Sequence, residues 1–136
     1  MFVRIAVGVL LGVALWCVLF MLFGVGVGLL WPEYREAARV MMQERTFLLF
    51  TVPMLFTNYF VFTAAGLGAG WVSAAVSKTS KSALATAVLL FVYAGSEHYV
   101  MLWNKLPDWY NLTIPIVIAG SVWLGGMFAR SRSRQA

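Results

Sequence analysis

The residues best suited to chemistry in this chain are Glu97 and His98, which stand side by side in an otherwise apolar segment. An ionisable side chain at membrane depth costs on the order of 2.5 to 3.5 kcal/mol at a helix centre, so it is rarely kept without a partner or a use. A carboxylate there can carry a proton or a cation, and an imidazole changes its charge near neutral pH. The pair therefore marks the candidate site.

Two interpretations of this pair stay open. In the first, Glu97 belongs to a proton or cation pathway. In the second, Glu97 and His98 join other polar residues in an interhelical hydrogen-bond network that fixes helix packing. The polar residues expected near the same depth on the preceding span are Thr51 and Asn58, with Arg45 at the end of that span.

Other site chemistries find little support in the sequence. A zinc site needs three or four convergent ligands, and one histidine beside one glutamate does not supply them. A haem held by two histidines is excluded because His98 is the only histidine. Cys17 is the only cysteine, so the chain forms no internal disulfide. We therefore predict neither a metal nor a cofactor.

Aromatic residues follow the candidate site. They are Trp103, Trp109 and Tyr110, with Pro107 among them. Tryptophan and tyrosine are enriched where a membrane meets water. We expect these residues to form an aromatic group at the outer membrane surface, where a quinone or a lipid head group could bind.

The elements that must position these residues are membrane-spanning helices. Hydrophobic residues make up 62% of the 136 residues and charged residues 11%, against about 25% charged in soluble proteins. The apolar runs are continuous rather than alternating, which excludes a β-barrel. The net charge of +5 sits mainly at segment ends, where it is expected to meet anionic lipid head groups and not nucleic acid.

The predicted fold is an all-α membrane protein: an antiparallel bundle of four transmembrane helices in a single domain, residues 1–136. The expected spans are about 5–31, 47–76, 82–103 and 112–129. The first two are longer than the roughly 20 residues that cross a bilayer, and the last two are close to that length. A short amphipathic helix at the membrane surface is expected over 32–45. We expect Pro53 to kink the second span and Pro115 to lie in the first turn of the fourth.

Glycines spaced four residues apart recur on two of the predicted spans. Such spacing places small residues on one helix face and lets a neighbouring helix approach closely. The pairs are Gly8 and Gly12, Gly24 and Gly28, and Gly66 and Gly70. We expect these faces to be helix interfaces.

Basic residues are distributed unevenly between the two predicted sides of the membrane. The side that holds both termini has six: Arg4, Lys78, Lys81, Arg130, Arg132 and Arg134. The other side has four, Arg35, Arg39, Arg45 and Lys105, offset by the acids Glu33, Glu36, Glu44 and Asp108. Because cytoplasmic loops carry the excess of lysine and arginine, both termini are predicted to be cytoplasmic.

Two sequence patches carry a resemblance. They are Trp31-Pro32-Glu-Tyr34, and the stretch from His98-Tyr99 through Trp103 to Pro107-Asp-Trp109-Tyr110. This pattern resembles that of a family of small uncharacterised four-span proteins of the bacterial inner membrane. The resemblance implies the same fold and location, but it supplies no activity. The residues for which it implies importance are His98, Trp103, Pro107, Trp109 and Tyr110.

We predict a non-catalytic accessory or assembly subunit that packs against other membrane subunits or against itself through its glycine-rich faces. The alternative is a small proton-coupled transporter or channel that uses Glu97. A third possibility is a membrane enzyme or a protein that binds a quinone or a lipid.

Overall fold

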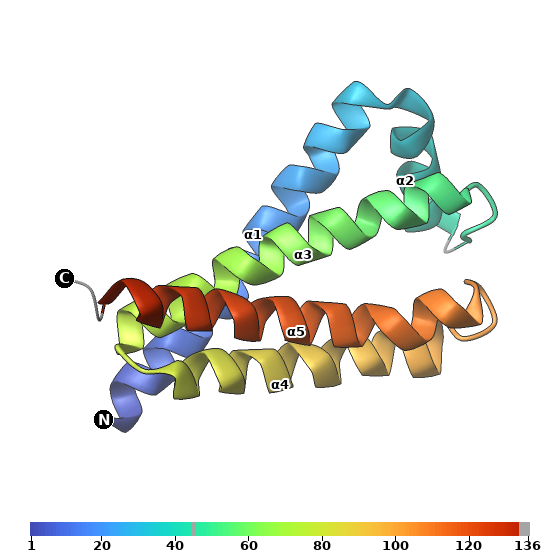
Figure 1. Ribbon diagram of the computed structural model, residues 1–136. Coiled ribbons are helices and arrows are strands. Elements are labelled where there is room, and N and C mark those ends of the chain that lie inside the picture. The colour runs from blue at the N-terminus through green and yellow to red at the C-terminus, as the bar shows by residue number, and fades with distance from the viewer. Residues whose placement is uncertain (45, 134–136) are drawn as a thin grey trace.

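The structure, a computed structural model, describes residues 1–44 and 46–133 (Figure 1). It is 88% helical, and the described residues contain no strand. The helical elements are α1 (Phe2–Leu30), α2 (Pro32–Glu44), α3 (Val52–Ser77), α4 (Ser80–Ser96), the π-helix η1 (Glu97–Met101) and α5 (Asp108–Ser133).

Four helices are long and apolar enough to cross a membrane: Phe2–Leu30, Val52–Ser77, Ser80–Met101 and Asp108–Ser131. Each runs antiparallel to the next along the chain (Figure 1). The predicted all-α bundle of four membrane helices is therefore confirmed. We call the end that holds α2 and the α4–α5 connection the α2 end, and the end that holds the start of α1 and the α3–α4 turn the terminal end.

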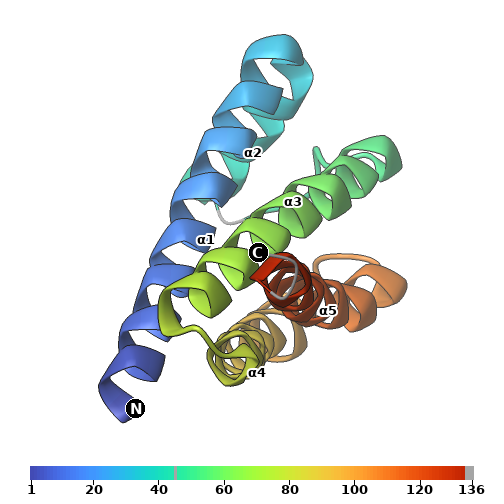
Figure 2. The ribbon, with the colours of Figure 1, turned by 60° about the vertical axis from the view of Figure 1, so that its left-hand side comes forward.

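Helix α3 lies at the centre of the bundle. Its most extensive contacts are with α5 and with α1, while α4 packs mainly on α5. Figure 2 looks nearly along α4 and α5 and shows α1 and α3 crossing them obliquely. The shared core contains Ala65 and Ala69 of α3 and the fully buried Ile114, Ile118 and Val122 of α5.

Glycines allow these helices to approach to backbone contact. A Cβ at Gly8 would lie 2.7 Å from the Ser73 carbonyl oxygen, and a Cβ at Gly12 would lie 3.0 Å from the Ser73 Cβ. A Cβ at Gly70 would collide with the backbone carbonyl of Val122, and one at Gly66 with the Ser121 side chain. Glycine is therefore required where α3 meets α1 and α5.

Short hydroxyl side chains complete the packing at the terminal end. Ser73 Oγ lies 3.0 Å from Thr86 Oγ1, and Ser82 donates a hydrogen bond of 2.8 Å to the Ser73 carbonyl. Ser77 bonds to the hydroxyl of Ser82 and donates to the Ser73 carbonyl. All four residues are buried, so their polar groups are satisfied between α3 and α4.

Helix α1 leaves the bundle beyond Phe20, whose ring still stacks on Phe62 of α3. The Trp16 ring stacks on Phe20 and on Phe62 of α3, with centroids 5.5 and 6.2 Å apart. Farther along, the second half of α1 moves away from the other helices until it meets α2 (Figures 1 and 2). In its most apolar stretch only 17% of residues are buried, against 33–44% in the other three spans.

Helix α2 lies against α1 and the start of α3. Tyr34 and Ala37 are buried beside Met54, as its amphipathic pattern predicts. The opposite face is exposed, and there Arg39 donates hydrogen bonds to Glu36 and to Gln43. The hydrogen bond from Arg39 lowers the pKa of the Glu36 carboxyl.

Both proline predictions differ from the structure. Helix α3 begins at Val52 rather than near residue 47, so Pro53 lies in its first turn and does not kink a helix interior. Helix α5 begins at Asp108 rather than near residue 112, which places Pro115 inside the helix. In both cases the helix begins where the preceding connection ends, and this residue differs from the one at which the apolar run begins.

Replacing Gly70 by alanine should destabilise the bundle. The new Cβ would collide with backbone of α5, which cannot rotate away as a side chain can, so we expect a loss of about 1 to 3 kcal/mol. Gly120→Ala is the matched control, because a Cβ at Gly120 meets no atom within 4 Å. Thermal unfolding in detergent should show a lower midpoint for Gly70→Ala alone; equal midpoints would contradict the close α3–α5 contact.

Candidate functional site

Polar side chains from three helices meet at the α2 end. The Tyr34 hydroxyl of α2 donates to Asn58 Oδ1 of α3, and Asn58 Nδ2 donates to the Tyr110 hydroxyl of α5 over 3.2 Å. Tyr34 and Tyr110 are 6% and 2% exposed. One asparagine amide therefore connects two buried tyrosines from different helices.

The surface helix places Tyr34 at this position. Pro32 occupies the first turn of α2, where proline is well tolerated, and the Tyr34 ring packs between Trp31 and Phe50 with centroids 6.1 and 5.9 Å away. Burial raises the pKa of the Tyr34 hydroxyl above its ordinary value. The hydroxyl therefore stays neutral at physiological pH and acts as a hydrogen-bond donor.

A π-helix turn positions His98. The backbone N–H of Leu102 donates to the Glu97 carbonyl over 3.0 Å, which is the five-residue spacing of a π-helix. His98 is buried within this turn, and its Nδ1 lies 2.9 Å from Asn111 Oδ1 of α5. A π-turn widens a helix locally, and at η1 the His98 side chain lies against α5. This contact is at the end of the third membrane helix.

Asn111 holds the connection between η1 and α5. Its side chain is fully buried, and Nδ2 donates to the carbonyls of Leu102, Trp103 and Leu106 over 3.1 to 3.3 Å. These carbonyls follow η1, where helix hydrogen bonding has stopped. Asn111 thus satisfies backbone acceptors in the connection after the third membrane helix, while its oxygen pairs with His98.

Tyr110 joins the two sets of hydrogen bonds. Its hydroxyl accepts from Asn58, and its ring meets the His98 ring edge to face at a centroid distance of 5.7 Å. We call the five residues the α2-end network: Tyr34, Asn58, His98, Tyr110 and Asn111. The network links α2, α3, η1 and α5 through buried polar and aromatic contacts.

Glu97 lies beside this network without a hydrogen bond to it. Its side chain is half-buried, and it forms no hydrogen bond or ion pair with any residue of 1–44 or 46–133. Its neighbour His98 uses its Nδ1 on Asn111 instead. Of the predicted polar cluster, the structure therefore brings Asn58 and His98 together through Tyr110 and leaves the Glu97 carboxylate apart.

The other predicted polar residues lie outside the network. Thr51 is the exposed N-cap residue of α3, and its side chain makes no capping hydrogen bond. Arg45 lies outside the described residues. Since α3 starts at Val52, Thr51 precedes the second membrane helix and does not line it.

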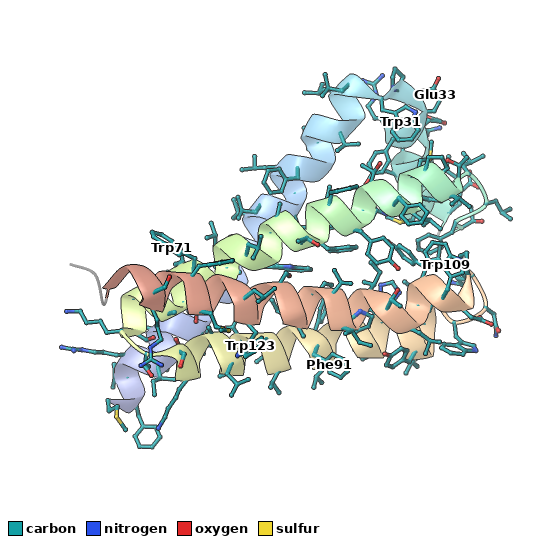
Figure 3. All side chains as sticks on the ribbon, in the orientation of Figure 1. Trp31, Glu33, Trp71, Phe91, Trp109 and Trp123 are labelled. Atoms are coloured by element: carbon teal, nitrogen blue, oxygen red, sulfur yellow. The ribbon has the colours of Figure 1, made fainter. Side chains whose placement is uncertain are left out.

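The predicted aromatic group divides into exposed and buried members. Trp103, Pro107 and Trp109 are exposed, whereas Tyr110 is buried. The Trp109 ring stacks on Phe56 of α3 at a centroid distance of 5.7 Å. Figure 3 shows Trp109 at the α2 end, with Trp71 and Trp123 farther along α3 and α5.

Of the predicted glycines, some pack against another helix and one does not. Gly66 and Gly70 lie against α5, and a Cβ at Gly28 would meet Arg35 of α2 at 3.3 Å. A Cβ at Gly24 would meet no atom within 4 Å. Gly24, in the second half of α1, is therefore not packed against any described residue of this chain.

Sequence reasoning missed Asn111 and Tyr34. Asn111 was expected to precede the fourth span, so its amide was not considered a buried group. Tyr34 lies within the amphipathic helix predicted over 32–45, and nothing in its spacing indicates that its hydroxyl reaches Asn58. A polar residue one position after a predicted belt tyrosine, followed by an apolar run, is the pattern that could have identified Asn111.

The site is suited to holding helices and not to binding a metal. Among the residues that the structure describes, no three His, Cys, Asp or Glu side chains lie close enough to hold a metal ion. Comparison with family models, curated proteins and solved structures gave no match to the chain. Function therefore has to be argued from the geometry.

Asn111→Leu should destabilise the α2 end. The substitution keeps the size of the side chain but leaves His98 and the carbonyls of Trp103 and Leu106 without the Asn111 amide, which costs roughly 1 to 3 kcal/mol for each buried group left unsatisfied. Asn104→Leu is the matched control, because Asn104 is exposed in the same connection. The measurement is thermal unfolding in detergent, and equal midpoints for the two variants would contradict a structural role for Asn111.

Proposed function

We propose that this protein is a non-catalytic accessory or assembly subunit of a membrane complex. In this proposal the second half of α1 receives a transmembrane helix of another subunit. The observation that carries it is the separation of this half-helix from the bundle, with an open glycine, Gly24, on its surface. Small residues at an unpacked helix position are what a close helix–helix contact in lipid requires.

The exposed residues of α1 support this proposal. Met21, Leu22 and Val25, in the second half of the most apolar helix, are 68%, 60% and 62% exposed. Gly24, between Leu22 and Val25, has no side chain to cover the backbone. In a bilayer this stretch meets either lipid or another helix, and the glycine favours a helix.

The α2-end network supports a structural role for the residues at the candidate site. The amide of Asn58 uses both its oxygen and its nitrogen within the network, and the Asn111 amide does the same. Tyr110 and Asn111 are 2% and 0% exposed. The network then fixes α2 and α5 on α3, which holds α1 at its angle to the bundle.

The remaining features of the proposal concern location. Four membrane-capable helices indicate a multi-pass protein of a lipid bilayer. The excess of basic residues at the terminal end supports cytoplasmic termini, with Arg4, Lys78, Lys81 and Arg130 among the described residues and Arg134 outside them. The resemblance to small bacterial proteins supports the inner membrane of a bacterium as the location.

Gly24→Leu should weaken partner binding without affecting the fold of the chain. A leucine fits beside the isolated chain but overpacks a close helix contact at a cost of about 1 to 3 kcal/mol, which corresponds to a loss of binding of about 5-fold to 150-fold. The measurement is the amount of co-purifying subunit after extraction from native membranes, with the thermal midpoint of the chain recorded in parallel.

Gly26→Leu serves as the matched control. Gly26 lies on the same half-helix with equally open surroundings, but two residues away and thus about 200° around the helix. Co-purification should survive this change. Equal recovery for both variants, or the absence of any stoichiometric partner or second copy, would contradict the accessory function.

One observation favours a second function, in which Glu97 carries a proton or a cation. The Glu97 carboxylate is half-buried in a π-turn and makes no hydrogen bond or ion pair with the described part of the chain. Carboxylates inside membranes often mark ion pathways, and π-turns are frequent at functional sites. The protein would then act as a small proton-coupled transporter or channel.

Glu97→Gln separates the two functions. In an accessory subunit, the substitution should leave accumulation, thermal stability and partner recovery as in the wild type, because the carboxylate holds no structural hydrogen bond. In a proton-coupled protein it should abolish pH-dependent flux in vesicles while the chain remains folded. Wild-type behaviour in all these measurements would exclude the second function.

A further inference from the structure

A pocket of about 380 Å³ lies at the terminal end, between the first turn of α1 and the α3–α4 turn. Its lining is rich in basic residues and contains no acid: Met1, Arg4, Ile5, Ser77, Lys78, Thr79 and Lys81. The volume lies within the range of small-molecule sites, roughly 300 to 1,000 Å³. The pocket is therefore large enough for a phosphate-sized head group.

Three cations converge on this pocket from separate elements. Arg4 comes from α1, Lys81 from the first turn of α4, and Lys78 from the turn between α3 and α4. None of the three forms an ion pair with an acid in the described ranges. Lys78 adopts the left-handed backbone conformation at φ 58°, which ends α3 and reverses the chain beside the pocket. Three unneutralised cations attract an anion.

A second hollow begins at the same lysine. One apolar face of α4, shallow and open on its outer side, continues from it; we call this face the groove, and it is formed by Lys81, Leu84, Ala85, Val88, Leu89 and Val92. From Lys81 to Val92 the helix rises about 16 Å. This length is about half of a hydrocarbon core of about 30 Å, so the groove crosses one leaflet of the bilayer.

We propose that the pocket and the groove form one binding site for an anionic phospholipid of the leaflet at the terminal end. The phosphate of the head group lies among Arg4, Lys78 and Lys81, and one acyl chain follows the groove past Ala85. Lys81 belongs to both hollows, which places the charge where the acyl chain begins. A free phosphate would use the pocket but gain nothing from the groove.

This site is independent of the proposed partner contact. The pocket is built on the first turn of α1, whereas the open glycine position lies on its second half, toward the other end of the bundle. A failure of the lipid site would therefore leave the accessory function untouched, and the reverse also holds.

The test uses the full chain purified in detergent. Phosphatidylglycerol and phosphatidylcholine with identical acyl chains are added separately, and inorganic phosphate is added in a third sample. Native mass spectrometry measures the bound lipid, and thermal unfolding measures the stabilisation. We expect phosphatidylglycerol to remain bound and raise the unfolding midpoint, with little effect from the other two.

Substitutions locate the site. Lys81→Gln and Arg4→Gln should each weaken phosphatidylglycerol binding about fivefold, as expected for removal of one cation beside an anionic head group. Ala85→Phe, at an exposed position of α4, should weaken binding by filling the groove. Lys105→Gln, an exposed lysine at the α2 end, is the control and should bind lipid as the wild type does.

Several results would overturn the proposal. Equal binding of the two lipids would show that charge does not select the ligand. Equal stabilisation by inorganic phosphate, or normal binding by Ala85→Phe, would show that the groove takes no part. Equal weakening by Lys81→Gln and Lys105→Gln would show that the lipid responds to net charge and not to this pocket.

Discussion

Close backbone contact along α3 is the constraint on which the rest of the structure depends. Helices in lipid gain little hydrophobic energy from association, so they must come close enough for dispersion and polar contacts to hold them. Gly66 and Gly70 allow α5 to reach the α3 backbone, while Gly8 and Gly12 allow α1 to lie on Ser73. Helix α3 thereby becomes the axis on which the other membrane helices are placed.

The angle between α1 and the bundle follows from where these small residues lie. Contact through Gly8 and Gly12 holds α1 only at the terminal end, and the stacked rings of Trp16, Phe20 and Phe62 fill the widening space beyond. Helix α1 then meets α2, whose Tyr34 is bonded to α3 through Asn58. The second half of α1 is thus held at both of its ends and uncovered between them, a rigid and accessible surface.

Much of this arrangement could be predicted from the sequence, and the part that could not has a physical reason. Continuous apolar runs predict the membrane helices, because length and composition alone decide whether a helix can cross a bilayer. The candidate site depends on the π-helix η1, whose turn contains about one residue more than an α-helical turn. This extra residue changes the side of the helix on which His98 lies. No residue between Glu97 and Met101 indicates such a turn, so the pairing of His98 with Asn111 could not be foreseen. The open position at Gly24 could not be foreseen either, because glycine spacing is the same whether a partner helix belongs to this chain or to another.

Buried polar groups are paired at both ends of the bundle, but by side chains of different length. Buried polar groups must find partners at both ends, but the distance between helices differs. At the terminal end the glycines bring α1, α3 and α4 together, and the short hydroxyls of Ser73 and Thr86 meet directly. At the α2 end α3 separates from α5 (Figure 1), and the bridge requires the longer side chains of Asn58 and Tyr110. Side-chain length thus matches helix separation at each end of the bundle: short hydroxyls bridge the closely packed helices at the terminal end, and longer side chains bridge α3 and α5 at the α2 end.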